Sequence, residues 1–106
     1  MRINRHLIEK MTLEKFAERH NLVLEMYERH PSLAGQFGKY FCYFSKIEES
    51  VGEGSGLQGI SGNGSTEDWA MNDYAQRLSN KKLIYDAHGQ DRKEIDSPYL
   101  THGVKR

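Results

Sequence analysis

The side chains that most often carry nucleophilic or metal chemistry are rare in this chain: one cysteine and five histidines. Cys42 lies within an aromatic run and has no histidine near it in sequence, which is typical of a small buried residue and not of a nucleophile. No histidine has a second histidine at i, i+4 or a cysteine at zinc-ligand spacing; they are His6, His20, His30, His88 and His102. We therefore expect no metal site, and we expect His20 at a helix end, where the helix dipole favours it.

Two further patterns invite a chemical interpretation. The glycines of Gly52–Gly64 suggest a phosphate-binding loop, but the lysine and hydroxyl residue that end such loops are missing. Glu67 and Asp68 follow and would occupy and neutralise the helix end where an anion would bind, which argues against a phosphate site there. Binding of a small nucleotide by backbone amides of the glycine loops is a distant third alternative, because such binding needs no sequence signature. Asp86, His88 and Asp91 could be an acid–base set, yet turn chemistry around a glycine explains them equally well. The sequence predicts no enzyme and no cofactor.

Composition limits the class of protein. The 106 residues include 15 Lys plus Arg and 15 Asp plus Glu, with 37% hydrophobic residues. A chain of this size forms one domain, and zero net charge removes the usual electrostatic footprint of a general nucleic-acid binder. No stretch is apolar enough to cross a bilayer, no secretory leader is apparent, and a single cysteine fits a reducing compartment. We expect a cytoplasmic location.

Hydrophobic periodicity predicts the elements that must position these residues. We expect a loose arm over residues 1–11, one domain over residues 12–100 and a flexible tail over residues 101–106. The predicted helices are Leu13–His20, capped by Thr12, and Glu67–Ser79. The predicted strands are Leu22–Tyr27, Lys39–Ile47, Leu57–Ser61 and a closing hairpin over 83–95, with turns at His30–Gly38 and Gly62–Gly64. The fold class is α+β: an α-β-β-β-α core with a C-terminal β-hairpin, whose antiparallel sheet carries helices on one face.

The order α-β-β-β-α resembles the double-stranded-RNA-binding domain over Thr12 to Leu78. The match is carried by the His30-Pro31 pair in the first hairpin loop and by Gly62–Ala70 (GNGSTEDWA), which parallels that family's glycine-x-glycine start of the second helix. The family places phosphate-clamping lysines there, whereas this chain has Glu67 and Asp68. The resemblance implies the scaffold, with nucleic-acid binding as an alternative function through four other residues: Arg19, Arg29, His30 and Lys39. The pattern also resembles small uncharacterised phage and prophage proteins, which implies an accessory factor.

Two features favour a surface that binds another protein. Trp69 is expected on the polar side of its helix, where it either packs under a neighbouring segment or serves as an aromatic anchor. The strand Tyr40–Phe44 is apolar on both faces, so one face meets the helices and the other needs a cover: the N-terminal arm, the C-terminal segment or another chain, with a homodimer as one option. The candidate partner-binding residues are Trp69, Glu67, Asp68, Asp73, Tyr43 and Tyr27.

We therefore expect a small non-enzymatic protein-binding factor, encoded by a phage or mobile element, that modulates a host protein such as a defence nuclease. Its acidic residues would face a basic partner surface. The alternative is a nucleic-acid-binding module that uses the basic residues named above.

Overall fold

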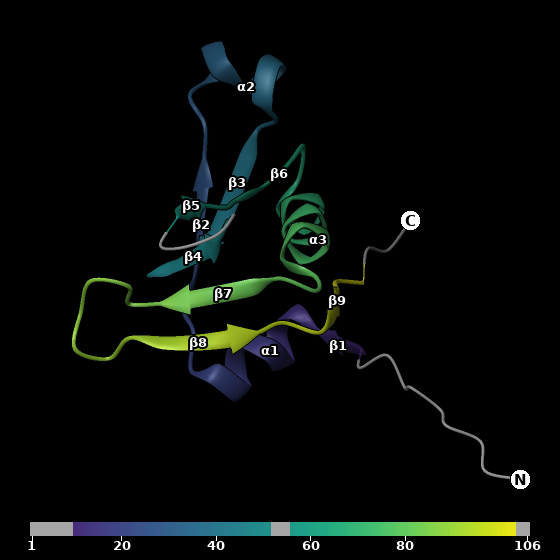
Figure 1. Ribbon diagram of the computed structural model, residues 1–106. Helices are drawn as coiled ribbons and strands as arrows, with labels where there is room; N and C mark the ends of the chain where they lie inside the picture. Colours follow the sequence, from purple (N-terminus) through teal and green to yellow (C-terminus); the bar gives the residue numbers. More distant parts are fainter. Residues whose placement is uncertain (1–9, 52–55, 104–106) are drawn as a thin grey trace, which may run out of the picture.

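The computed structural model describes residues 10–51 and 56–103 (Figure 1). These ranges contain three helices: α1 (Leu13–His20), α2 (Pro31–Phe37) and α3 (Glu67–Leu78). They also contain nine short strands: β1 (Lys10–Thr12), β2 (Leu24–Glu28), β3 (Tyr40–Phe44), β4 (Ile47–Ser50), β5 (Leu57–Gly59), β6 (Gly62–Gly64), β7 (Lys82–Tyr85), β8 (Lys93–Asp96) and β9 (Tyr99–Thr101). The α+β class is confirmed.

Helix α1 begins and ends where its capping residues predict. The Thr12 side chain accepts a hydrogen bond from the Lys15 amide at 3.2 Å, which satisfies one of the free donors of the first turn. Asn21 ends the helix in the left-handed conformation, with φ of 55°. Local capping therefore defines the ends of this helix.

The strands form two antiparallel sheets and one parallel pair, where the sequence predicted a single sheet. One sheet has the order β2-β3-β6 and the other the order β5-β4-β7-β8. The predicted strand Lys39–Ile47 divides at Ser45 and Lys46, so that β3 and β4 belong to different sheets. The closing hairpin is confirmed as β7 and β8.

The chain ends differ from their prediction where the structure describes them. Residues 1–9 and 104–106 lie outside the described residues. Lys10 and Met11, expected in a loose arm, belong to β1, which pairs in parallel with β9 through Met11 and Leu100. Met11 and Leu100 are both buried in the core, so burial of apolar surface explains why this pair forms.

Two predicted turns are wrong. His30–Gly38 contains helix α2, whose first turn has Pro31 at a position that tolerates proline and His30 as its cap. Gly62–Gly64 is strand β6, paired with Tyr40–Cys42 of β3. Both segments are rich in residues that favour turns. Here the proline begins a helix, and the glycines allow a helix to pack closely on the strand.

Helices α1 and α3 pack on the same face of the β2-β3-β6 sheet. On this face Phe44 contacts Phe16 of α1 and Tyr74 of α3, with ring centroids 6.2 and 5.3 Å apart. Cys42, on the same face, is fully buried. The predicted choice between the two faces of β3 is thereby resolved, because Tyr40, Cys42 and Phe44 meet the helices.

The glycines of β6 let α3 approach this sheet closely. A Cβ atom on Gly62 would overlap the Ala70 carbonyl and the Tyr74 backbone, and one on Gly64 would lie 2.6 Å from the Trp69 carbonyl carbon. A side chain at either position would therefore push the helix away from the sheet. The glycine-x-glycine pattern is a packing feature here.

We predict that Gly62→Ala destabilises the protein by about 2–3 kcal/mol, because the added methyl group has no space. Gly59→Ala is the matched control, since its Cβ would meet nothing within 4 Å. Urea unfolding of both variants measures the difference. Equal stability of the two variants would contradict the close packing of α3 on β6.

The Tyr74 hydroxyl ends the β3–β6 ladder. It accepts a hydrogen bond from the Phe44 amide at 2.7 Å, at the point where β6 no longer accompanies β3. Burial raises the pKa of Tyr74 above its usual value, so this group stays protonated across the physiological range. A side chain of α3 thus satisfies a buried backbone donor that lacks a strand partner.

Tyr74→Phe should cost about 1–3 kcal/mol, because it leaves the buried Phe44 N–H without an acceptor. Tyr85→Phe, at a partly exposed position, should change the free energy of unfolding by less than about 0.5 kcal/mol. Amide exchange at Phe44 provides a local readout, and unchanged protection in Tyr74→Phe would refute this role.

Candidate functional site

Three aromatic side chains lie together on the face of the β2-β3-β6 sheet that the helices leave uncovered. Tyr27 lies opposite Phe41 in the strand register, and Tyr43 is diagonal to it. The ring centroid of Tyr27 lies 5.2 Å from that of Phe41 and 5.7 Å from that of Tyr43, and the ring planes are inclined by 21° in each pair. We call Tyr27, Phe41 and Tyr43 the aromatic face. Tyr27 is 41% exposed and Phe41 and Tyr43 are half-buried, so the cluster is partly open to solvent.

Arg29 extends the aromatic face toward α2. Its guanidinium carbon lies 4.6 Å from the Phe41 ring centroid and 5.5 Å from that of Phe37. The guanidinium donates hydrogen bonds to the carbonyls of Phe37 and Gly38, both at 3.1 Å, and to the Asn63 side-chain oxygen. Arg29 therefore ties the end of α2 to β2 and β6, and three of its donor groups are used within the chain.

The hydroxyl of Tyr27 is held by its neighbours. The neighbouring Tyr43 hydroxyl is the largest influence that raises the pKa of Tyr27 to about 12, followed by desolvation and the charge of Glu25. The hydroxyl also lies 3.2 Å from the Glu25 carboxylate, to which it donates. The Tyr27 hydroxyl contact with Glu25 thus adds to the packing of the rings in the aromatic face.

Tyr43→Phe should lower the pKa of Tyr27 toward the usual value of about 10, because the substitution removes the hydroxyl that Tyr27 contacts. Alkaline titration followed by the ring-carbon NMR signal of Tyr27 measures the change. Tyr99→Phe, which removes an exposed hydroxyl on β9, should leave the titration unchanged. A Tyr27 pKa that is insensitive to Tyr43→Phe would argue against the coupling.

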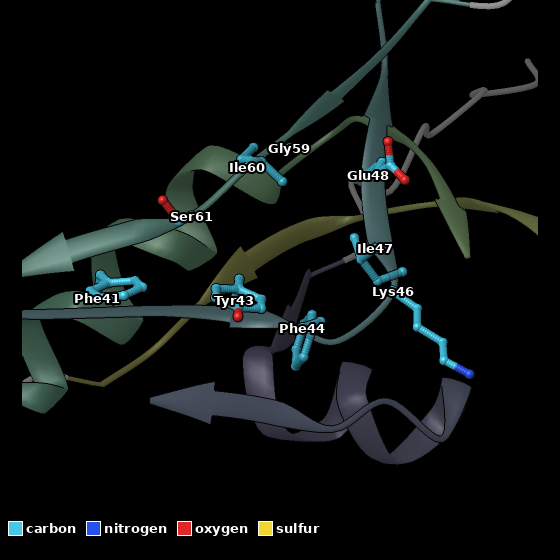
Figure 2. Close-up of a pocket in the computed structure, with 9 residues that line it drawn as sticks. All are labelled: Phe41, Tyr43, Phe44, Lys46, Ile47, Glu48, Gly59, Ile60 and Ser61. Atoms are coloured by element: carbon cyan, nitrogen blue, oxygen red, sulfur yellow. The ribbon is translucent and has the colours of Figure 1, made fainter. Parts of the chain in front are cut away.

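A pocket of about 440 Å³ opens beside the aromatic face (Figure 2). Cys42 pairs with Gly62, and Glu48 pairs with Gly59, so the five residues 43–47 lie opposite only two, residues 60–61. The longer strand bulges outward at Lys46, which has a positive φ of 66°. The lining residues are Phe41, Tyr43, Phe44, Lys46, Ile47, Glu48, Gly59, Ile60 and Ser61. We call this hollow the bulge pocket.

The structure separates the predicted partner-binding residues into two groups. Tyr27 and Tyr43 belong to the aromatic face, whereas Trp69, Glu67, Asp68 and Asp73 belong to α3 on the opposite side of the sheet. Trp69 is 38% exposed. Asp73 has partners within the chain. Its carboxylate accepts hydrogen bonds from the backbone amide of Asn63 at 2.8 Å and from the Arg77 side chain at 2.9 Å.

The start of α3 is acidic and is joined to the C-terminal segment by His102. Thr66 caps the helix by accepting from the Trp69 amide at 3.1 Å, and Glu67 and Asp68 occupy the first turn. The His102 ring lies between Asp68, at 3.0 Å from Nε2, and Glu14 of α1, at 2.6 Å from Nδ1. Carboxylates and not lysines therefore surround the place where the resembled family grips phosphate.

The predicted nucleic-acid-binding residues do not form one basic surface. Arg19 lies on α1, at the opposite end of the molecule from α2 (Figure 1), while Arg29 and Lys39 face each other in the β2–β3 hairpin. Lys39 forms an ion pair with Glu28 at 3.8 Å, and His30 Nδ1 accepts from the Ser32 amide at 3.2 Å as the cap of α2. Three of the four side chains thus have partners within the hairpin and α2.

The remaining candidates have structural surroundings. Cys42 is buried, and desolvation raises the pKa of its thiol to about 11, which suppresses the reactive thiolate. The Asp86 carboxylate accepts from the Asp91 amide at 3.2 Å, as expected for a turn. Within residues 10–51 and 56–103, no three His, Cys, Asp or Glu side chains gather as metal ligands would. The described helices are also too short or too polar to span a membrane.

Comparison of the chain with protein-family models, curated proteins and solved structures finds no match. The resemblance to the double-stranded-RNA-binding domain therefore stays a prediction.

Sequence reasoning missed several residues of this surface. Phe41 could have been assigned to it, because the alternation of β3 places Phe41 and Tyr43 on one side and Cys42 on the other. Glu48 and Ile60 could not, since they approach the aromatic face only through the bulge between β3 and β4. The mismatch in strand register that produces this bulge has no local sequence signal.

Proposed function

We propose that this chain is a non-enzymatic binding protein that docks on another protein through the aromatic face. The observation that carries the proposal is the ordered cluster of Tyr27, Phe41 and Tyr43 on the sheet face opposite the helices. Exposed aromatic clusters ringed by polar groups are typical of protein interface hot spots. Val23 and Phe37, 65% and 49% exposed, add apolar surface on the neighbouring segments.

Ring geometry favours a protein partner over a nucleic acid. Stacking platforms for nucleic-acid bases need free ring faces and nearby cations for the phosphates. Here the ring faces of Tyr27 and Phe41 are approached by neighbouring side chains, and Arg29 donates to three acceptors within the chain. The acidic start of α3 also repels a phosphate backbone. That a phage encodes this protein, and that its partner is a host protein, stay predictions.

Affinity capture with the full chain, from a lysate of the cells that carry it, tests this proposal. Wild type should retain a stoichiometric protein, and Tyr27→Ser should weaken that complex about tenfold or more, as expected for loss of an interface hot spot. Tyr99→Ser is the matched control, because Tyr99 is 43% exposed but lies on β9. A second copy of the chain counts as a partner of this kind.

Three outcomes would overturn the proposal. One is a complex that Tyr27→Ser and Tyr99→Ser retain equally. Another is the absence of any protein partner. The third is recovery of a salt-sensitive nucleic acid in place of a protein, which would restore the alternative function.

A further inference from the structure

We infer that the bulge pocket receives a lysine or arginine side chain of the docked protein. This inference rests on the proposed function and names the chemistry of its contact. The pocket shares Phe41 and Tyr43 with the aromatic face, so a protein seated on that face reaches both. The gap between residues 43–47 and residues 60–61 gives the pocket its opening.

The walls of the bulge pocket suit the aliphatic stem of a long side chain. Ile60 supplies apolar surface, with a small contribution from Ile47, which is buried in the core, and Phe41 and Tyr43 supply aromatic rings. Figure 2 shows Ile60 and Glu48 on opposite sides of the hollow. Lysine and arginine bury such stems against apolar surface while their charged heads reach a polar group, and their cations are attracted to aromatic rings.

Glu48 supplies the charge that selects a cation. Its side chain is half-buried at the pocket, and among the described residues no lysine, arginine or histidine forms an ion pair with it. The next residue, Glu49, is paired with Lys81 at 3.4 Å, whereas Glu48 has no such partner within residues 10–51 and 56–103. A half-buried carboxylate gains from a cationic partner, because burial removes part of its hydration.

Lys46 does not neutralise the pocket. Its side chain extends from the bulge toward α1, and its ammonium group lies away from Tyr43 and Ile60 (Figure 2). The charge arrangement favours a guanidinium or an ammonium group over a carboxylate or a neutral group.

Titration of the full chain with n-butylguanidinium and with n-butylurea tests this inference by amide NMR. The two probes have similar shape and differ in charge, so wild type should bind the guanidinium about threefold more tightly or better. Shifts should concentrate at Glu48, Ile60 and Tyr43. In Glu48→Gln the preference for the cation should disappear. Glu94→Gln, which removes an exposed carboxylate of β8 that pairs with Lys82, should retain it.

Equal binding of both probes by wild type would overturn the inference, as would an unchanged preference in Glu48→Gln. These failures are distinct from failure of the proposed function. If Tyr27→Ser releases the captured protein while the probes show no cation preference, docking stands and the pocket assignment falls. If the cation preference holds while Tyr27→Ser keeps every partner, the aromatic face is not the docking surface.

Discussion

The architecture depends on how closely α3 approaches β6. Gly62 and Gly64 present no side chains to the helix, so the backbones of the two elements meet directly. This contact brings the Tyr74 hydroxyl to the Phe44 amide and seals Cys42 and Phe44 beneath the helix. Any side chain on β6 at these positions would separate the layers and open the core.

The same contact determines what the other face of the sheet presents. Strand β3 is apolar on both sides, and α3 and α1 cover only the side that bears Phe44. Phe41 and Tyr43 must then point outward, where Tyr27 of β2 packs beside them. An exposed aromatic cluster is thus the consequence of covering one face of a doubly apolar strand.

Charge is distributed so that little of it remains free near this cluster. Arg29 is bonded to backbone carbonyls, Lys39 to Glu28 and Asp73 to Arg77. These contacts hold the hairpin, α2 and α3 in place. They use side chains that the sequence alone had predicted to bind a nucleic acid or another protein. Glu48, at the bulge between the two sheets, is the contrasting case on which the inferred cation contact depends.

The sequence by itself determined the elements that depend on local interactions. Helix α1 follows from Thr12, Asn21 and the spacing of its apolar residues, and α3 and the closing hairpin follow from similar signals. Only the tertiary structure decided that Gly62–Gly64 is a strand, that β3 and β4 diverge, and that β1 pairs with β9. Each of these depends on contacts between residues distant in sequence, where packing overrides local turn preference. The bulge pocket is therefore a property of strand register, which residue types alone do not specify.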